Sequence, residues 1–571
     1  MRKRFTGNKR NIAGHSSAGR HILPLLAFLL LLVPGCTPAP APQSVPAPSI
    51  APVTPPVPAA SAPLTEVAAE RFATGIEGWE GVADAGATSE VVWDSGGRLI
   101  WSVRAEGGQI AGLSRQWPAL TGADGLTIRL TSLDRYAFLL LAVTEADGSA
   151  YSLVLPVDEA APAEHTVSFA GFSLHQETED ENGQLDPGQL ATLTLVDISA
   201  AISAAGPNRV SIEEIVLWRG VFQPDFYPVA AAAPGVKDFR VGVDANFVPQ
   251  GERANHPFRA GGQPVDPLEL FAANGANGFR LRLWVGDDGE SKLGYATDLA
   301  KRAAGAGLRP YLVLFLAEGW ADVNKQPAPA AWANLAIPER AAAVRQYAFE
   351  TAQHFADEGI TLDFYEIGNE IDYGICGVFA DTATPRDIAY LSREIWPDEA
   401  RFIQAAVEGV RQADPDARIM LHIASSWDPP LAAAFFREMA DAGVEYDYMG
   451  FSHYPTAFGT AATARLFETL DRLRADIGKP VIIAEAAYPA EVPSGGLFGD
   501  WRHPLPGYPM TPLGQAWWLA DLLKSMRSRP DVLGVYLFSP EFWFSGELWG
   551  PFSLFDGNGE ARPAIGSLKS R

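Results

Sequence analysis

Apolar runs and amphipathic stretches alternate through residues 239–571. Between successive runs lie stretches with apolar residues at helical spacing, such as PERAAAVRQYAFETAQHFADEG and TARLFETLDRLRADIG. Eight strand–helix repeats predict a (β/α)8 TIM barrel over residues 239–571, with an active site at the carboxyl ends of its strands. The eight strand-like runs begin at Phe239, Phe279, Arg309, Leu362, Arg418, Tyr446, Pro480 and Leu533.

The pattern upstream of the predicted barrel is different. Residues 64–221 contain short β-rich runs, among them GLTIRLTS, AFLLLAVTE and LATLTLVDIS, separated by turn signals such as Asp147-Gly148. Several short strands at this spacing predict an all-β sandwich or jelly roll. The segment resembles jelly-roll modules attached to carbohydrate-active enzymes, so it is a candidate carbohydrate-binding module; the alternative is a spacer domain without a ligand. We interpret its acidic run, residues 177–182, as a solvated loop, with a calcium site as the alternative.

The N-terminal region is typical of a targeting segment. Residues 1–35 carry basic and no acidic residues, and the apolar run over 22–35 is too short for a comfortable membrane span. It ends in VPGC, which resembles a bacterial lipobox, so residues 1–35 are predicted to be a lipoprotein signal peptide cleaved before a lipidated Cys36. Residues 36–63 are rich in proline and predict an extended linker, and residues 222–238 predict a second one.

These features predict an extracytoplasmic protein of a bacterium. It would be a cell-surface lipoprotein that meets the membrane only through Cys36, or, with an ordinary secretory signal, a secreted protein. The chain has two cysteines, so lipidation of Cys36 leaves Cys376 as an unpaired thiol, and no disulfide is expected.

Composition and charge narrow the range of partners. The 571 residues are 47% apolar, which allows large cores, and the formal net charge is −24 at pH 7. Such a chain is repelled by nucleic acid and by anionic lipid surfaces, so we expect a neutral substrate and no nucleic-acid partner. The nine histidines show no ligand spacing such as HxxxH, and neither a metal nor a cofactor is expected. A monomer is expected.

Two carboxylates stand at the ends of predicted strands. The fourth run ends in IGNE, Ile367 to Glu370, and the seventh ends near Glu485. Paired carboxylates at one rim of a barrel are what glycoside hydrolysis needs, because one donates a proton to the leaving oxygen while the other attacks or activates water. The alternative is that Glu370 caps the following loop and that Glu485 pairs with a barrel arginine.

Asn-Glu after strand four and Glu after strand seven is the pattern of a large clan of retaining (β/α)8-barrel glycosidases. Within this clan the sequence resembles glycoside hydrolase family 53, the endo-β-1,4-galactanases, over most of residues 241–568. The resemblance implies a retaining endo-glycosidase that cleaves a β-linked plant polysaccharide, with β-1,4-galactan (arabinogalactan) first. It is carried by GVDANF, GANGFRLRLWV, GWADVNKQPAPAAW, YEIGNEIDYG, IMLHIASSWD, YDYMGFSHYP and VIIAEAAYP.

By position, the resemblance implies that Glu370 is the acid/base and Glu485 the nucleophile. Their carboxyl groups would then lie about 5–5.5 Å apart. The acid needs a raised pKa, and the nucleophile must stay ionised. Asn369 would hydrogen-bond the 2-hydroxyl of the substrate.

Other strand residues are expected to support this pair. Arg280 matches the strand-two arginine of the clan, which helps to keep the nucleophile charged, and Arg282 lies one layer away as the reserve candidate. Asp244, at the end of the first run, is a further candidate for substrate binding. His453 and Tyr454 should point to opposite faces at the end of the sixth run, and the resemblance favours Tyr454 as the neighbour of the nucleophile.

Tryptophans fall at or after the strand ends. Aromatic rings stack on the C–H faces of sugars, so a rim lined by tryptophan suits a polysaccharide groove. We favour Trp320 and Trp543 as sugar contacts, keep Trp284 as a candidate, and expect about half of the set to be packing residues. The set is Trp284, Trp320, Trp332, Trp543 and Trp549.

Two segments depart from the family pattern. After strand three the family has His-Tyr-Ser-Asp, whereas residues 315–318 are Phe-Leu-Ala-Glu. After strand six it has Ser-Tyr-Tyr-Pro, whereas residues 452–455 are Ser-His-Tyr-Pro. Because these positions line the sugar site in the family, two alternatives remain: a related glycosidase acting on mannan, xylan or glucan, and a non-catalytic surface glycan-binding lipoprotein.

Overall fold

The computed structural model describes residues 47–53 and 64–570, with gaps at 106–108, 158–161, 176–177, 179, 181–184, 200–205, 221–226, 228–237, 382–385, 458–459, 500, 503 and 506. The predicted signal peptide, Cys36 and most of both predicted linkers lie outside the described residues. None of the described helices is long and apolar enough to cross a membrane.

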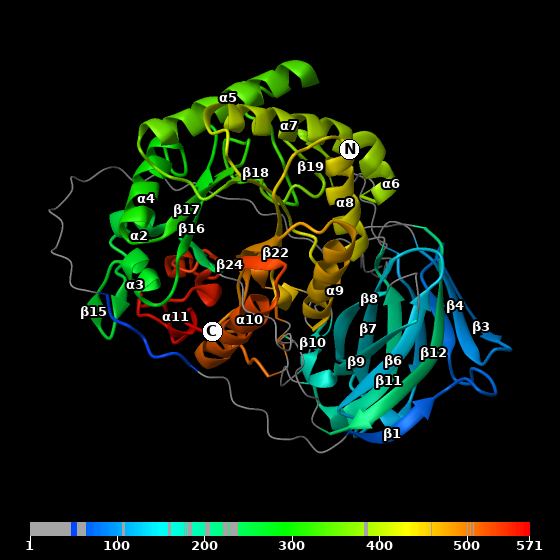
Figure 1. Cartoon of the computed structure of the whole chain (residues 1–571). Coiled ribbons are helices and arrows are strands. Elements are labelled where there is room, and N and C mark those ends of the chain that lie inside the picture. The colour runs from blue at the N-terminus through cyan, green and yellow to red at the C-terminus, as the bar shows by residue number, and fades with distance from the viewer. Residues whose placement is uncertain are drawn as a thin grey trace, which may run out of the picture.

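The N-terminal domain is a sandwich of two six-stranded antiparallel sheets (Figure 1). Its apolar core is shared by the two sheets, with Ile128 and Trp101 from one and Leu141 and Leu195 from the other. The predicted all-β domain is confirmed. One sheet consists of β1 (Thr65–Glu70), β3 (Thr88–Asp94), β4 (Arg98–Arg104), β6 (Gly125–Ser132), β9 (Ala163–Ser168) and β12 (Asn208–Arg219), and the other of β2 (Glu80–Ala83), β5 (Ala111–Gln116), β7 (Ala137–Glu145), β8 (Ala150–Val157), β10 (Ser173–Leu174) and β11 (Leu190–Asp197).

The C-terminal domain is a closed barrel of eight parallel strands, which confirms the predicted TIM barrel. The fourth strand is shorter than the predicted run over 362–367, because only its last three residues form ladder pairs with both neighbours. The strands are β13 (Arg240–Asp244), β16 (Gly278–Leu283), β17 (Arg309–Leu314), β18 (Tyr365–Ile367), β21 (Ile419–Ile423), β22 (Tyr448–His453), β23 (Val481–Ala486) and β24 (Val532–Phe538).

Helices surround the barrel as an outer layer (Figure 1). Short hairpins and single-turn helices fill the loops: β14 (Arg259–Ala260) with β15 (Gln263–Pro264), β19 (Gly374–Ile375) with β20 (Val378–Phe379), η5 (Pro455–Ala457), η6 (Gly496–Phe498), η7 (Trp543–Ser545) and η8 (Gly550–Phe552). The helices are α2 (Val248–Arg253), α3 (Pro267–Ala273), α4 (Leu293–Gly305), α5 (Ile337–Asp357), α6 (Ile388–Tyr390), which continues through a π-helical turn (Leu391–Ile395) into α7 (Trp396–Ala413), α8 (Pro429–Asp441), α9 (Thr460–Asp476), α10 (Pro512–Ser528) and α11 (Ala564–Ser567).

The sandwich contacts the barrel near α8 and α9 (Figure 1). Tyr136 donates a hydrogen bond of 3.3 Å to the carbonyl of Trp427, just before α8. Its ring lies 5.1 Å from the guanidinium of Arg465 on α9. Burial and Arg465 also lower the pKa of His165 on β9 to about 4, so this histidine is neutral in the contact.

Part of the predicted first linker is docked on the barrel. Ile50 and Val53 pack against the barrel's outer core. The amide of Ile50 donates 2.8 Å to Asn274 Oδ1, and Asn274 Nδ2 donates 3.1 Å to the carbonyl of Pro48. Asn274 follows α3 and precedes β16, so residues 47–53 lie at the end of the barrel where the strands begin, opposite the predicted active-site rim.

One residue of the predicted second linker is buried in the helix layer. The hydroxyl of Tyr227 lies 3.0 Å from His453 Nε2 and accepts a hydrogen bond of 2.6 Å from Trp518 Nε1 on α10. Its ring packs edge-on against Phe467 and Tyr508. The linker residue is thus a packing element of the barrel.

Changing Tyr227 to Phe should lower the free energy of unfolding by about 1–3 kcal/mol, because the indole N–H of Trp518 and His453 Nε2 lose their buried partner. Urea unfolding followed by tryptophan fluorescence measures the change. Tyr536→Phe is the matched control, because the Tyr536 hydroxyl is buried without a hydrogen-bond partner among the described residues. Equal effects of the two changes would show that the Tyr227 hydroxyl does not stabilise the fold.

Candidate active site

A backbone turn at the end of β18 presents Glu370. Gly368 has a φ of +77°, and a Cβ there would lie 2.4 Å from the side chain of Ile371, so only glycine fits. Glu370 itself has a φ of +49°, a left-handed conformation that costs free energy for a residue with a side chain. The surrounding structure therefore holds the Glu370 carboxyl in one place, where only 8% of the residue is exposed.

A β-bulge presents Glu485. Along β22 and β23 the paired residues run Phe451 with Ile483 and then Ser452 with Glu485, so β23 has one extra residue at Ala484. The side chain of Ala484 already belongs to the core inside the barrel. Strict alternation would turn Glu485 outward, and the bulge restores its inward direction.

The carboxylate of Glu485 has two polar neighbours. Tyr454 donates a hydrogen bond of 2.6 Å to Oε2. Arg280 Nη1 lies 2.8 Å from Oε1 and forms an ion pair with it. The N–H groups of Arg280 are directed at other acceptors, so the buried Oε1 receives no hydrogen bond from any described residue.

Glu370 has the opposite environment. Ser452 Oγ lies 2.6 Å from Oε1, within hydrogen-bond distance, and among the described residues the charges that act most strongly on the carboxyl are other carboxylates. Burial first, and then the negative charges of Glu485 and Asp322, raise the pKa of Glu370 well above its usual value. Glu370 therefore favours its neutral, proton-carrying form.

Arg280 joins four strands beneath the two carboxyl groups. Its guanidinium donates 2.7 Å to Asp244 Oδ2 on β13, 2.7 Å to Glu366 Oε1 on β18 and 2.6 Å to Asn369 Oδ1. Burial acts to raise the pKa of Glu366, but the positive charge of Arg280 and the hydrogen bonds from Arg280 and His422 outweigh it and hold the pKa at about 2. Glu366 is therefore ionised.

Asn369 is oriented by its own hydrogen bonds. Its Oδ1 accepts from Arg280, and its Nδ2 donates 2.9 Å to the carbonyl of Ala321. An amide nitrogen carries two hydrogens, so one N–H remains for a substrate hydroxyl.

Arg282, the reserve candidate, lies in a different environment. It forms an ion pair of 2.7 Å with Asp244 and donates 2.9 Å to Ser539 Oγ. The rings of Phe538, Phe247 and Trp320 surround its guanidinium at 4.5, 4.9 and 5.3 Å. None of its ion pairs or hydrogen bonds among the described residues involves Glu485, so Arg280 is the arginine next to this carboxylate.

The tryptophan candidates occupy different places. Trp320 is half-buried beside Phe315 and Phe538, and its Nε1 donates 2.8 Å to Asp322. Trp284 is half-buried near Phe315 at the end of β16. Trp543 packs against His256 and Phe544, at the α2 side of the barrel. Trp332 packs against Tyr347 of α5 as a loop residue, and Trp549 is buried.

His453 faces away from the two carboxyl groups. Its imidazole is buried beside Tyr227, and burial lowers its pKa to about 3. This position is incompatible with direct substrate binding, whereas Tyr454 lies at Glu485, on the opposite side of the strand end.

Three inward residues of the site were not predicted from the sequence: Glu366, His422 and Ser452. Two-residue alternation along β18, β21 and β22 is the signal that could have found them.

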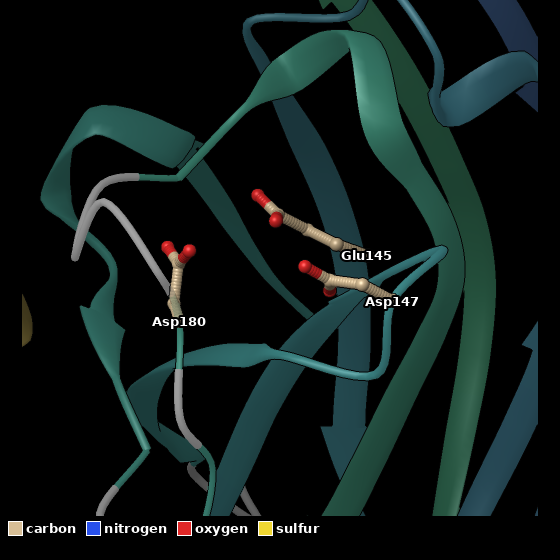
Figure 2. A group of neighbouring side chains, drawn as sticks. All are labelled: Glu145, Asp147 and Asp180. Atoms are coloured by element: carbon tan, nitrogen blue, oxygen red, sulfur yellow. The ribbon is translucent and has the colours of Figure 1, made fainter.

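A second acidic group lies in the sandwich, outside the barrel. Glu145, Asp147 and Asp180 bring carboxylate oxygens within 4.8 Å of one another (Figure 2). The backbone N–H of Ser149 donates to Asp147, its hydroxyl lies within hydrogen-bond distance of both Glu145 and Asp147, and Tyr151 donates to Asp180. Asp180 comes from the acidic run over 177–182, so part of this run turns toward the sheet edge.

A (β/α)8 barrel with two buried carboxyl groups at its carboxyl rim, one neutral and one ion-paired, has the arrangement of a glycoside hydrolase. The family to which it belongs follows from the sequence. The profile of glycosyl hydrolase family 53 matches residues 240–568, so the chain belongs to this family and is a glycoside hydrolase.

Three relatives illustrate the similarity. The chain is 31% identical to an uncharacterized protein of Niallia circulans, in the bgaB 5′ region, over 58% of this chain and 94% of that protein. It is 29% identical to the arabinogalactan endo-β-1,4-galactanase of Cellvibrio japonicus, over 57% of this chain and 90% of the relative. A fungal β-1,4-galactanase structure aligns with a TM-score of 0.51 and 26% identity, over 58% of this chain and 98% of that structure.

The electrostatic coupling of the two carboxyl groups is testable without substrate. Replacing Glu485 with Gln removes a nearby negative charge, so the pKa of Glu370 should fall while staying raised by burial. Carbon-13 NMR titration of glutamate-labelled protein, assigned with Glu370→Gln, measures the change. Glu408→Gln is the control, because that side chain on α7 is 67% exposed and should leave the Glu370 titration unchanged.

Proposed function

We propose that the protein is a retaining endo-β-1,4-galactanase in which Glu370 is the acid/base and Glu485 the nucleophile. The observation that carries the proposal is the contrast between the two carboxyl environments. Burial and neighbouring carboxylates favour protonated Glu370, whereas Arg280 and Tyr454 bind the carboxylate of Glu485.

The two environments fit the two steps of a retaining mechanism. In the first step Glu370 gives its proton to the glycosidic oxygen while a carboxylate oxygen of Glu485 attacks the anomeric carbon. The bond between that carbon and the glycosidic oxygen breaks, and a glycosyl–enzyme ester forms. In the second step the ionised Glu370 takes a proton from water, and the water oxygen displaces Glu485 from the same carbon. The second step returns both carboxyl groups to their starting forms.

The buried charges favour a positive transition state. Among the described residues inside the barrel, the guanidinium groups of Arg280 and Arg282 face the carboxylates of Asp244, Glu366 and Glu485. With Glu370 protonated, this set carries one excess negative charge. An oxocarbenium-like sugar developing above Glu485 gains from that charge, and the free N–H of Asn369 is available to its 2-hydroxyl.

Several features support a neutral β-linked polysaccharide as the substrate. Relatives that align with most of the barrel carry the name arabinogalactan endo-β-1,4-galactanase, which is why galactan leads. Trp320 and Trp284, half-buried beside Phe315, offer rings for stacking, and Trp543 remains a candidate. The phenyl ring of Phe315 has replaced a histidine of the family pattern, and this keeps mannan and glucan as alternatives.

Hydrolysis of purified galactan, mannan and glucan of equal chain length tests the proposal. We expect galactan to be cut fastest, and NMR of the first product should show the retained β-anomer. Glu370→Gln and Glu485→Gln should each lower the rate on galactan by several orders of magnitude with the circular dichroism unchanged. Near wild-type hydrolysis by Glu485→Gln would contradict the assigned roles, and cleavage of another glycan alone would contradict the substrate.

We further propose that the enzyme is a lipoprotein anchored outside the cytoplasm through Cys36. Ten residues, 37–46, lie between Cys36 and Ala47, the first described residue, so the two are at most about 40 Å apart. Residues 47–53 dock at the base of the barrel, so an anchor at Cys36 would leave the base nearer the membrane and the active-site rim open to polysaccharide.

Cys36→Ser should move the protein from the membrane fraction to the soluble fraction in the producing bacterium, because the acylated thiol is lost. Fractionation followed by immunoblotting measures this. Cys376→Ser is the control, since that cysteine is buried in the barrel and should not affect membrane association. A wild-type protein found wholly in the medium would point to an ordinary secretory signal.

A further inference from the structure

A continuous chain of polar groups leads from Glu370 into the barrel. Ser452 Oγ lies 2.6 Å from Glu370 Oε1 and 3.0 Å from His422 Nε2. His422 Nδ1 lies 2.9 Å from Glu366 Oε1. Ser452, His422 and Glu366 are each at most 1% exposed, so no bulk water competes for these contacts.

The positions of the protons follow from Glu366, the innermost member of this hydrogen-bonded series. Glu366 is ionised by its contacts with Arg280 and can only accept hydrogen bonds. His422 therefore carries a hydrogen on Nδ1 and donates it to Glu366, and in the neutral imidazole Nε2 is an acceptor facing Ser452.

Ser452 has a single hydroxyl hydrogen and two neighbours that can accept it. Ser452 can donate to Glu370 or to His422 Nε2, but not to both. Which neighbour accepts depends on the proton of Glu370, because a protonated carboxyl donates to the serine and an ionised one only accepts.

We propose that Ser452 and His422 form a buried hydrogen-bond switch that positions Glu370 in both of its roles. With Glu370 protonated, its O–H donates to Ser452 Oγ, and Ser452 donates to His422 Nε2. To act as the acid, the Glu370 O–H turns from Ser452 Oγ to the leaving oxygen and gives it the proton. The serine hydroxyl then rotates and donates to the new carboxylate. No proton leaves the serine or the histidine; only the direction of the hydrogen bonds reverses. The inference rests on the acid/base role proposed for Glu370.

In this switch the serine and the histidine shift the pKa of Glu370 in opposite directions. The serine stabilises the carboxylate by donating to it, whereas His422 Nε2 competes for the same hydrogen and so favours protonated Glu370. Other ionisable groups act on the chain from neighbouring elements: Glu485 on β23, Asp322 after β17, Asp372 after β18, Tyr454 after β22 and Arg280 on β16.

The pH dependence of kcat/KM on galactan, or on whichever glycan the enzyme cuts, tests the switch. The alkaline limb reports loss of the Glu370 proton in the free enzyme. Ser452→Ala should move this limb to higher pH by about one pH unit, because the carboxylate loses its donor. His422→Phe should move it to lower pH, because Ser452 then donates to Glu370 alone. A merely structural role would lower kcat without opposite movements of the limb.

Ser452→Thr provides the matched control, because it keeps the hydroxyl and should restore the wild-type limb. If His422→Phe does not fold, the difference in the alkaline limb between Ser452→Ala and Ser452→Thr is enough to test the switch. An unmoved limb in Ser452→Ala, with Glu370→Gln inactive, would overturn the switch and leave the proposed function intact. Full activity of Glu370→Gln would overturn the proposed function itself.

Discussion

The buried guanidinium of Arg280 is the interaction on which the active site depends. It contacts Asp244, Glu366 and Glu485, three carboxylates from β13, β18 and β23, and has no exposed surface. Removing these charges from water is costly, and the cost is offset only while every partner stays in place. The same contacts fix the geometry of the rim, because an arginine that must satisfy three strands at once leaves little freedom for Glu485 or Asn369 to move.

Two backbone distortions direct the carboxyl groups of Glu485 and Glu370 toward the site. A regular strand ending at Glu485 would point the carboxylate into the helix layer, and the bulge at Ala484 turns it back toward Arg280. Glu370 is held with positive φ beyond Gly368. Such conformations persist only where the surroundings outweigh their cost. The packed barrel below and the ion pairs between its strands supply the stabilising free energy that offsets this cost. The stability of the scaffold thus maintains a strained rim.

Much of the fold and of the active site could be predicted from the sequence, and the features that could not be predicted were missed for physical reasons. The eight repeats predicted the barrel, because a helix period and a strand period are distinct patterns. Glu370 and Glu485 followed from their positions at strand ends, and Arg280 followed from the resemblance to the family. The bulge could not be predicted, since an extra residue in a strand leaves the hydrophobic pattern of VIIAEA almost unchanged. The docking of residues 47–53 and of Tyr227 was missed for another reason: proline-rich and linker-like composition carries no signal for a long-range contact.

Substrate recognition depends on the wall that stands beside this charged centre. Phe315 brings a phenyl ring within 5.5 Å of the Trp320 centroid and 6.4 Å of the Trp284 centroid. A phenyl ring offers no hydrogen-bond donor, so the discrimination between sugar epimers on this side must come from other groups. The Asp322 carboxylate lies beside this wall: Trp320 donates to it from 2.8 Å, and burial raises its pKa. Its negative charge also raises the pKa of Glu370, so the aromatic wall and the acid/base are linked through one buried carboxylate.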